Sequence, residues 1–536
     1  MKSENIMLPF RGGMVDPSKN TYFLHLKNPQ RVLDVIPSGV LLGPNLVAVA
    51  TTPSNTVLLK RLGIQAPSKL QWGYRWPIQP GRTPFWWQKQ TAEFLVTNPR
   101  AFCFNSPGTG KTSSALWAYD YLRENKAVLE PMLVLCPKSC VRSVWYEEAQ
   151  LTMPHLTTLP LLGSGEARIQ DIKQDADIYV ANHHTLLTEG TPLLDRKWGV
   201  IVLDEATVAQ DSSTQMWAAL LALIEANPSA AFWCLTGTPC SQSPAQAYGL
   251  AKLVNPSTTK FSLTTWKKSV QWQIKRVDPQ TGAYQFSKWE NKPDATEKVF
   301  ALLQPAIRID KREVMPFLPP ITFSTREVEM EPGSKKAYTA MKEDGLVKIS
   351  GQAITAVHAA NQANKLLQIS SGILIGEDGT IRLSVKNRLA VLREIIESSA
   401  SKTIVAVPFT EALHAVAEDV ALYRSVRIIK GDVSTKQRAE IVAEFQSQAE
   451  PAVLLVQPKT TGHGLTLTAA CTIVWWSAIY SQEVYKQMCE RTDRPGQKHP
   501  QRIIHLCSTP QEKYVYNVLQ GLGQKQLDLL AMYNAQ

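Results

Sequence analysis

Cysteine is scarce in this chain, and its spacing supports neither cross-linking nor metal binding. The 536 residues include eight cysteines, and no two of them form a C-x-x-C pair. Most lie in apolar, strand-like runs, as expected for reduced thiols in a protein core. The pattern argues against a zinc site and favours a cytosolic compartment.

Long hydrophobic runs, short-period repeats and low-complexity tracts are also absent. No segment approaches the roughly 20 apolar residues of a membrane span, and the start of the sequence has no apolar signal-peptide core. The hydrophobic fraction of 44% and the charged fraction of 19% fit a folded globular protein. We therefore expect a soluble cytoplasmic protein with roughly three or four domains or subdomains and no membrane partner.

Acidic residues are outnumbered by basic ones, 46 against 57, which gives a formal net charge of +11. A basic balance suits a polyanionic partner, and nucleic acid is the first candidate. A basic surface without such a partner would give the same charge. The motifs along the chain must decide between the two.

A glycine-bearing loop at Ser106–Thr112 is the most informative segment of the chain. An apolar run before it, Ala101–Phe104, predicts a buried strand, and the residues after it predict a helix. A loop between a strand and a helix start presents backbone N–H groups and the positive helix end to a polyphosphate. Lys111 would reach the β- and γ-phosphates, and the Thr112 hydroxyl would bind Mg²⁺. Asn105 stands where the pattern has its first glycine, so an ordinary strand-to-helix turn is the alternative.

Two acidic residues, Asp204 and Glu205, follow a second apolar run at Val200–Leu203. Carboxylates at the carboxyl end of a parallel strand face the crevice in which α/β sheets bind ligands. Asp204 suits a Mg²⁺ ligand, and Glu205 could polarise the attacking water. An exposed acidic turn is the alternative, and the phosphate loop upstream favours the catalytic interpretation. The later segment Thr236–Pro239, also after an apolar run, suits a polar relay that senses the γ-phosphate.

Near the end of the chain, the spacing of Gln487, Arg491 and Arg494 is i, i+4 and i+7. A helix would place these residues on one face, and Pro495 should end that helix at about Arg494. Arginines offered across a cleft can neutralise the charge on a γ-phosphoryl group during its transfer. A solvated basic helix is the alternative.

Two regions alternate strand and helix patterns, which predicts an α/β fold with two parallel sheets. The strands expected in the first region are Met132–Cys136, Ile178–Ala181, Val200–Leu203 and Ala231–Leu235, and those in the second are Thr403–Val407, Val426–Ile429, Ala452–Val456, Thr472–Trp475 and Arg502–His505. The predicted domains are a small β-containing accessory domain at 1–80, a first lobe at 81–255, an insertion or connector at 256–385 with helices at Ser334–Asp344 and Ala353–Ser370, and a second lobe at 386–536.

The connector contains a run, Thr265–Arg276, that interleaves aromatic and basic residues. Such a run can stack on nucleobases and neutralise phosphates. An amphipathic helix with Trp266 and Trp272 in a core explains the same pattern and is slightly favoured. The strand-end pair His183–His184 has no partner acids and is interpreted as structural.

Taken in order, the motifs resemble those of the superfamily 2 helicases, and most specifically the SWI/SNF-type branch of DNA-dependent ATPases. The resemblance covers about residues 84 to 510, and so many motifs in one order make it specific. The segments that carry it are 84–88, 106–112, 136–139 with Trp145 and Glu148, 204–207, 236–239, 430–445, 459–470 and 487–497. The short length and the compact amino-terminal segment are similar to the small phage-encoded members of this branch.

The resemblance implies two RecA-like lobes with ATP and Mg²⁺ as cofactors. The implied nucleotide-binding residues are Gln88, Gly108, Thr109, Gly110, Lys111, Thr112 and Gln487, with Thr112 and Asp204 as metal ligands. The implied catalytic residues are Lys111, Asp204, Glu205, Arg491 and Arg494. Nucleic acid would contact hydroxyls, basic side chains and backbone amides on one face of both lobes, with Lys138, Ser139, Thr460 and Thr461 as candidates.

The implied function is ATP-dependent translocation along double-stranded DNA, with double-stranded or forked DNA as the partner, in the cytoplasm of a bacterial host if the protein is phage-encoded. A fork-remodelling, unwinding or annealing helicase is the main alternative, and an RNA helicase is a weaker one. The chain could instead be an ATPase module that docks a partner protein through residues 1–80. Three departures from the branch could alter turnover or coupling: Ser106-Pro107 in the phosphate loop, Thr207 in place of a histidine, and Thr466 where asparagine is frequent.

Overall fold

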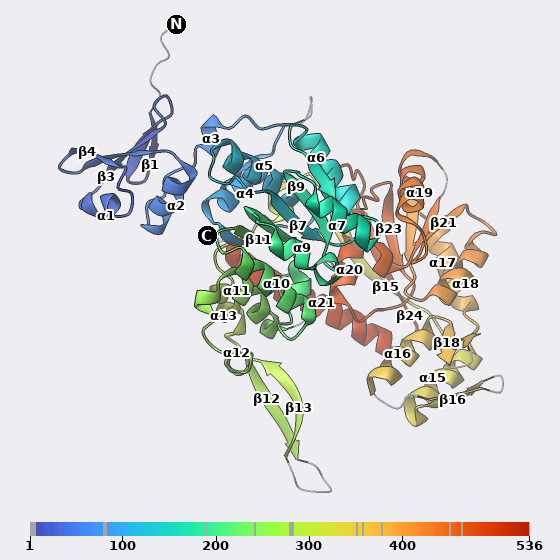
Figure 1. Cartoon of the computed structure of the whole chain (residues 1–536). Helices are drawn as coiled ribbons and strands as arrows, with labels where there is room; N and C mark the ends of the chain where they lie inside the picture. The colour runs from blue at the N-terminus through green and yellow to red at the C-terminus, as the bar shows by residue number, and fades with distance from the viewer. Residues whose placement is uncertain are drawn as a thin grey trace. The chain divides into compact units, whose positions relative to one another are not determined.

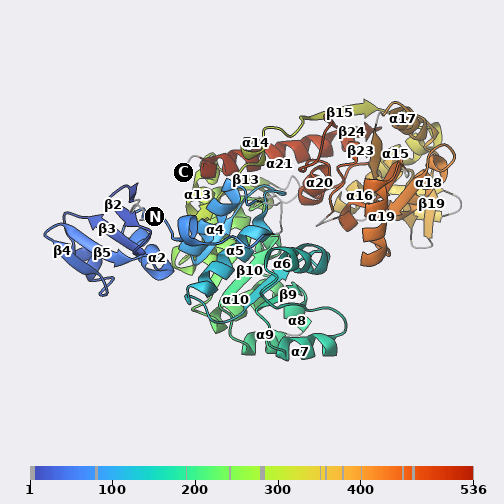
Figure 2. The same ribbon diagram turned by 90° about the horizontal axis from the view of Figure 1, so that it is seen from above.

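The computed structural model describes residues 7–78, 83–188, 190–240, 243–277, 284–349, 352–355, 359–376, 379–399, 401–449, 452–461 and 465–534. Contacts between residues divide the chain into two compact units, whose elements are labelled in two views (Figure 1) (Figure 2). The first unit comprises Met1–Val314 together with Asp528–Gln536, and the second comprises Met315–Leu527. The chain therefore passes from one unit to the other twice, after Val314 and after Leu527.

The amino-terminal part of the first unit is a five-stranded antiparallel sheet. In sheet order, its strands are β1 (Leu8–Phe10), β2 (Gly13–Asp16), β3 (Thr21–His25), β5 (Leu46–Ala50) and β4 (Val40–Gly43). Alternate residues of β3 and β5, such as Tyr22 and Val47, are buried in a small core of their own. Three helices accompany the sheet, namely α1 (Gln30–Leu33), α2 (Pro53–Arg61) and α3 (Leu70–Gly73).

The centre of the first unit is a seven-stranded sheet in which every pair of neighbours is parallel. In sheet order, its strands are β14 (Ala306–Ile307), β6 (Arg100–Cys103), β11 (Ala231–Leu235), β10 (Val200–Asp204), β7 (Met132–Cys136), β9 (Ile178–Asn182) and β8 (Thr158–Pro160). All residues of β7 and β11 are buried, because helices cover both faces of the sheet. The strands predicted from apolar runs in this region are confirmed, with ends shifted by at most one residue.

Helices form most of the connections between these strands. They are α4 (Trp86–Thr97), α5 (Lys111–Glu124), α6 (Glu147–Thr152), α7 (Gly165–Lys173), α8 (Thr185–Thr188), α9 (Gly190–Asp195), α10 (Gln215–Ala226), α11 (Ala247–Val254), α12 (Leu263–Val270), α13 (Ala295–Leu302) and α14 (Lys311–Val314). A continuous apolar core joins the sheet to α10, α11 and α13.

A two-stranded antiparallel ribbon projects from the first unit between α12 and α13 (Figure 1). Its strands are β12 (Gln271–Val277) and β13 (Tyr284–Asn291). The favoured helical interpretation of the aromatic and basic run is therefore wrong after Val270. Trp266 on α12 is buried as expected, whereas Trp272 on β12 is 49% exposed. The helix ends because Gln271 adopts an extended conformation and pairs with Asn291.

The centre of the second unit is a six-stranded sheet, and its neighbours are again all parallel. In sheet order, its strands are β15 (Ile321–Glu327), β24 (Gln501–Cys507), β23 (Ala470–Trp475), β20 (Lys402–Ala406), β22 (Val453–Val456) and β21 (Val426–Ile429). The helices are α15 (Pro332–Asp344), α16 (Ala359–Ser370), α17 (Lys386–Glu397), α18 (Thr410–Val420), α19 (Thr435–Ser447), α20 (Gln482–Cys489) and α21 (Pro510–Asn534), and the last residues of α21 belong to the first unit. The five strands predicted here are confirmed, with ends shifted by at most two residues.

Helices α15 and α16 share a small separate core with two antiparallel ribbons. The ribbons are formed by β16 (Leu346–Ile349) with β17 (Gln352–Thr355) and by β18 (Ile373–Gly376) with β19 (Gly379–Arg382). The helix predicted at Ala353–Ser370 is therefore too long at its start. Its first residues lie in β17, where the β-branched Ile354 and Thr355 favour a strand.

Each unit thus contains a RecA-like α/β lobe built on a parallel sheet, as expected from the sequence. Among the helices of the described ranges, none has both the length and the apolar character needed to cross a bilayer.

Candidate nucleotide-binding site

The phosphate loop joins β6 to α5 in the first unit. Gly108 and Gly110 adopt left-handed conformations, with φ of 83° and 84°, which residues with a Cβ rarely adopt. Gly110 immediately precedes the 14-residue helix α5. The backbone N–H groups of the first turn and the positive end of the helix therefore face the loop, where phosphate oxygens can bind. The strand, loop and helix predicted for this segment are confirmed.

Helix α4 places Gln88 against the phosphate loop. A Cβ at position 110 would collide with the amide nitrogen of Gln88, so Gly110 is required for this close approach. The Gln88 Oε1 accepts a hydrogen bond of 2.9 Å from the backbone N–H of Phe85. The neighbouring Trp87 Nε1 donates one of 3.1 Å to the carbonyl of Thr109. Gln88 and the phosphate loop, which the sequence assigns to one nucleotide, therefore lie side by side.

Lys111 and Thr112 begin helix α5, and both are half-buried. The Lys111 Nζ donates hydrogen bonds to two loop carbonyls, that of Asn105 at 2.9 Å and that of Ser106 at 3.4 Å. The ammonium group therefore lies over the loop, within reach of a phosphate placed there. The Thr112 hydroxyl, in the same helical turn, is an oxygen ligand of the kind that Mg²⁺ prefers.

Asp204 is the last residue of β10, and both of its carboxylate oxygens accept hydrogen bonds. Trp145 Nε1 donates to Oδ2 over 2.8 Å, and the backbone N–H of Glu205 donates to Oδ1 over 3.1 Å. The buried His183 donates from Nε2 to the Asp204 carbonyl over 2.9 Å, since a carbonyl can only accept. Desolvation raises the pKa of Asp204 above its ordinary value, although the Trp145 hydrogen bond and the charge of Lys111 act against this rise. The carboxylate is held in one orientation, which suits a metal ligand.

Glu205 has a left-handed backbone, with φ of 50° and ψ of 60°, which is uncommon for a residue with a side chain. The chain bends here from β10 into a short 3₁₀ turn at Ala206–Ala209. Such costly conformations concentrate at functional sites. Asp204 ends the strand, whereas Glu205 lies at the bend that follows it, and the two neighbouring acids therefore have different backbone settings.

The segment Thr236–Pro239 follows β11, the strand that lies between β6 and β10. A Cβ on Gly237 would come within 3.2 Å of the Pro107 ring, so this segment packs on the phosphate loop. The Thr236 hydroxyl accepts a hydrogen bond of 3.0 Å from the backbone N–H of Thr238. This position next to the phosphate loop suits the predicted γ-phosphate relay. It also shows that Pro107, which departs from the family pattern, packs against Gly237.

The second unit holds the remaining candidates, and one prediction about them is wrong. Gln487 lies in α20, but that helix ends at Cys489. Gln487, Arg491 and Arg494 therefore do not share one helical face. After Cys489 the backbone leaves the helical path, and the Arg491 carbonyl accepts a hydrogen bond of 3.0 Å from the backbone N–H of Leu467 instead of one within a helix.

The two arginines nevertheless bind the same short segment of the second unit. Arg491 is buried, and its Nη1 donates to the Leu465 carbonyl over 3.4 Å. Arg494 is half-buried, and its Nη1 donates to the Thr466 hydroxyl over 3.0 Å. Thr466, another departure from the family pattern, therefore orients a predicted catalytic arginine.

The nucleic-acid candidates differ in accessibility. Lys138 is exposed and Ser139 is half-buried, directly after the carboxyl end of β7. The Thr460 hydroxyl donates to the Gln457 carbonyl over 2.7 Å, so it already has a partner within the protein. The side chain of Thr461 and residues 462–464 lie outside the described residues.

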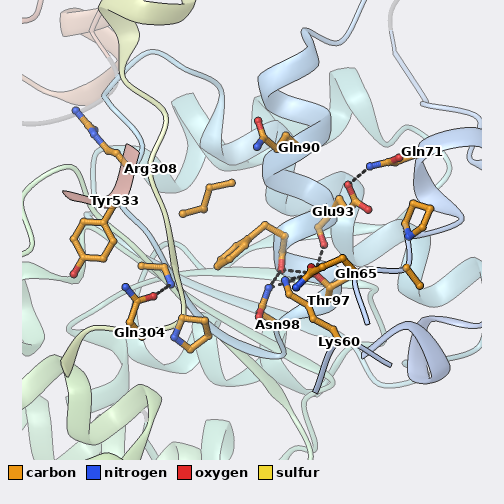
Figure 3. Close-up of a pocket in the computed structure, with 16 residues that line it drawn as sticks. Lys60, Gln65, Gln71, Gln90, Glu93, Thr97, Asn98, Gln304, Arg308 and Tyr533 are labelled. Carbon is orange, nitrogen blue, oxygen red and sulfur yellow. Dashed lines mark hydrogen bonds between the residues drawn. The ribbon is translucent and has the colours of Figure 1, made fainter. Parts of the chain in front are cut away.

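A cavity of about 600 Å³ lies elsewhere in the first unit, between the accessory sheet's helix α2, helix α4 and strand β14 (Figure 3). Its polar lining includes Lys60 from α2, Glu93 from α4, and Gln304 and Arg308 from either side of β14. Tyr533, from the end of α21, closes another part of the wall. The residues predicted to act on ATP do not line this cavity.

Comparison with known proteins gives matches over most of the chain. Residues 87–374 match the SNF2-related domain, and residues 387–496 match the helicase conserved C-terminal domain. Protein p41 of Acyrthosiphon pisum secondary endosymbiont phage 1 is 26% identical over 443 residues, covering 79% of this chain and 92% of p41. The ISWI chromatin-remodeling complex ATPase ISW1 of Saccharomyces cerevisiae is 22% identical over 453 residues, covering 78% of this chain and 38% of ISW1. The chain thus spans less than half the length of this larger relative.

A solved structure, the SWI2/SNF2 ATPase core of Sulfolobus solfataricus in complex with dsDNA, is 21% identical and covers 83% of this chain and 92% of its own, with a TM-score of 0.40. The likeness to p41 agrees with the resemblance to phage-encoded proteins. Because the SNF2-related domain model alone matches residues 87–374, more than half of the chain, this protein belongs to the SNF2-related family of helicase-like ATPases.

Proposed function

We propose that this chain is an ATP-dependent motor that moves along double-stranded DNA. The proposal rests on the convergence of the phosphate loop, Asp204 and Glu205 at the carboxyl edge of one parallel sheet. Open α/β sheets bind their ligands at this edge. The net charge of +11 and the family membership support DNA as the polyanionic track.

In this proposal, Lys111 exchanges its two loop carbonyls for the β- and γ-phosphate oxygens of ATP. The phosphates would receive hydrogen bonds from Gly108, Thr109 and Gly110, with Gln88 next to the adenine. Thr112 and Asp204 offer oxygen ligands that would hold Mg²⁺, which when bound would neutralise charge on the phosphates.

Glu205 orients and polarises the attacking water, and the two arginines of the second unit complete the chemistry. Arg491 and Arg494 neutralise the charge that develops on the γ-phosphoryl group, and Gln487 contacts the nucleotide. Because these groups belong to a different unit from Lys111, the proposed turnover requires residues of both units. Catalysis is then positioning and electrostatics, with no covalent intermediate.

Contacts to the DNA backbone would hold the motor on its track. Lys138 and Ser139 from the first unit and Thr460 and Thr461 from the second are the proposed phosphate contacts. Alternation of these two sets between tight and loose binding during the ATP cycle would move the chain along the duplex.

Triplex displacement, measured with ATP hydrolysis in the same mixture, tests this function. We expect the protein to displace a triplex-forming strand without unwinding the duplex beneath it, and duplex DNA to stimulate hydrolysis. Lys111→Ala should abolish both activities, whereas Lys173→Ala, an exposed lysine at the end of α7, should change neither. Normal DNA-stimulated hydrolysis by Lys111→Ala would overturn the proposal.

A fork-remodelling or unwinding enzyme is the second candidate, and the ribbon β12–β13 favours it. A two-stranded ribbon is only marginally stable on its own in water, and an exposed aromatic such as Trp272 can stack on an unpaired base. If this function holds, Trp272→Ala should reduce fork unwinding or annealing but not triplex displacement. Tyr514→Ala, which removes an aromatic that is 64% exposed in the second unit, is the matched control.

The accessory sheet offers a surface for a protein partner in the bacterial host cytoplasm. Val40, Leu41 and Leu42 on the edge strand β4 are each more than half exposed. Exposed apolar edges invite pairing with another chain. A host or phage protein that copurifies with the wild type, and is lost in Leu41→Lys while ATP hydrolysis continues, would support this role.

A further inference from the structure

The phosphate loop is bonded to the segment through which the chain leaves the first unit. This exit segment, residues 308–314, follows β14, ends with α14 and leads into the second unit at Met315. It continues the pairing of β14 with β6 beyond the end of the sheet. The backbone N–H of Phe104 donates to the Ile307 carbonyl over 2.8 Å, and that of Ser106 donates to the Ile309 carbonyl over 3.0 Å.

Two side chains of the loop complete this attachment. The Asn105 Oδ1 accepts a hydrogen bond of 2.9 Å from the backbone N–H of Ile309. The Ser106 hydroxyl accepts one of 3.1 Å from the backbone N–H of Lys311. Asn105 is 1% exposed and Ser106 is 7% exposed, so water does not compete for these bonds.

The same two residues also hold the phosphate-binding lysine. Their carbonyl oxygens accept the hydrogen bonds of Lys111 Nζ, while their side chains hold the exit segment. Asn105 is further fixed by its Nδ2, which donates to the Thr91 hydroxyl over 2.8 Å. If phosphate draws the ammonium group away, the two carbonyls lose a charged partner, and the peptide groups of Asn105 and Ser106 must adjust.

The segment in which the chain returns to the first unit, from Asp528 on, also contacts the strand end next to the phosphate loop. Tyr533, in the part of the chain that returns to the first unit, packs edge to face on Phe104, with ring centroids 5.1 Å apart and planes at 69°. The Arg308 Nη1 of the exit segment donates to the Phe104 carbonyl over 2.5 Å. Both passages therefore contact the residue that directly precedes Asn105.

The exit segment begins beside open space. Gln304 and Arg308 line one wall of the 600 Å³ cavity, and Gln90 and Glu93 of α4 line the opposite wall (Figure 3). Strand β14, which precedes the exit segment, is thus hydrogen-bonded to β6 on one side and faces the cavity on the other. A small shift of the strand away from the loop would meet little packed protein.

We infer that Asn105 and Ser106 are positioning residues that transmit nucleotide binding from Lys111 to the exit segment. Withdrawal of Lys111 from their carbonyls changes the hydrogen bonds that their side chains make to Ile309 and Lys311. The position of the chain entering the second unit then depends on the nucleotide. The inference rests on the proposed ATP site and deepens it, by naming the residues that link the site to motion.

Hydrogen exchange of the full-length chain, with and without a non-hydrolysed ATP analogue, tests this inference. In the wild type, the analogue should change the exchange rate of peptides covering the exit segment by about tenfold, the effect of gaining or losing one hydrogen bond. In Ser106→Ala this change should shrink to less than about twofold, while the first turn of α5 still responds to the analogue. Ser106→Thr keeps the acceptor oxygen and should restore the response.

The matched control is Ser114→Ala, which removes a buried hydroxyl that donates to the Gly110 carbonyl over 3.0 Å but does not bind the exit segment. It should respond as the wild type does. The inference is overturned if the wild-type exit segment does not respond while α5 does, if Ser106→Ala responds normally, or if no part of the chain responds. A wild type that fails to displace a triplex strand would overturn the proposed motor function alone, because the exchange measurement needs neither DNA nor hydrolysis.

Discussion

The indole of Trp145 donates a hydrogen bond of 2.8 Å to the carboxylate of Asp204, 59 residues further along the chain. Trp145 is itself fully buried, so its ring is fixed by the core of the first unit. The orientation of a predicted metal ligand is therefore set by packing. The sequence analysis named Trp145 only among the segments that carry the family resemblance, and no local signal pointed to its hydrogen bond with Asp204.

Trp145→Phe keeps the aromatic packing but removes this hydrogen bond. We expect the Mg²⁺ concentration that half-saturates ATP hydrolysis to rise by about tenfold, because loss of a residue that orients a metal ligand typically weakens metal binding by that order. Trp198→Phe removes a similar buried indole bond, to the Leu193 carbonyl, and should leave the Mg²⁺ requirement unchanged. An equal shift in both variants would mean that general loss of stability is responsible.

Alanine at Gly110 should be more harmful than alanine at Gly108. Both glycines have a positive φ, so both substitutions cost about 1–3 kcal/mol of backbone strain. A Cβ on Gly108 would meet no atom within 4 Å, whereas a Cβ on Gly110 would collide with Gln88. The free energy of unfolding, measured by urea denaturation, should fall further in Gly110→Ala, and adding Gln88→Ala, which removes the colliding side chain, should recover part of that extra loss. Equal losses in the two single variants would exclude the collision.

Removal of one partner of the buried pair Arg388–Glu512 should destabilise the second unit. The two groups are 2.8 Å apart, with side-chain exposures of 2% and 0%. Glu512→Ala leaves a buried guanidinium without its counter-charge, and the free energy of unfolding should fall by about 3–5 kcal/mol. Urea unfolding followed by circular dichroism measures this loss. The double variant Arg388→Met/Glu512→Met should be closer to the wild type than the single variant, and a larger loss in the double variant would contradict this account.

The buried imidazole of His505 should make the second unit sensitive to mild acid. Its Nε2 lies 2.8 Å from the Tyr485 hydroxyl, and burial lowers its pKa from 6.5 to about 4. The unfolded chain therefore binds the proton more readily than the folded one. The stability that the folded protein gains from keeping His505 neutral is fully present above pH 6.5. It is lost as the pH falls from 6.5 towards 4, and the free energy of unfolding decreases by about 3 kcal/mol over this range. The free energy of unfolding of His505→Phe should vary less across this window, and an equal variation would contradict the assignment.

Local patterns were sufficient to predict the phosphate loop and most strands of both sheets, whereas the edge strands β8, β14 and β15 were missed. Strands covered on both faces are continuous apolar runs, so Met132–Cys136 and Ala231–Leu235 could be read directly from the sequence. The loop was predictable because glycine, lysine and threonine occur there at fixed spacing between a strand and a helix. Both signals lie within a few residues of the structure that they specify.

Features that depend on distant partners were missed. The hydrogen bond from Ile309 to Asn105 joins residues 204 positions apart, so the departure at Asn105 had no visible reason in the sequence. The sequence predicted that Pro495 ends the helix at about Arg494, but α20 already ends at Cys489. Just after this end, the Arg491 carbonyl is hydrogen-bonded to the distant Leu467, which local sequence does not reveal. Trp272 followed a helical pattern but lies in a strand, because pairing between β12 and β13 overrides local preference.

Leu529 and Tyr533 belong to the apolar core of the first unit, although in the sequence they follow all residues of the second unit. A ribosome therefore delivers these two residues of the first core only after it has synthesised the whole second unit. A fragment that stops at Val314 would leave Phe104 without the Tyr533 ring against it. We expect the first unit to complete its folding only after the second unit has been synthesised, and to be more stable in the intact protein than as a fragment that stops at Val314.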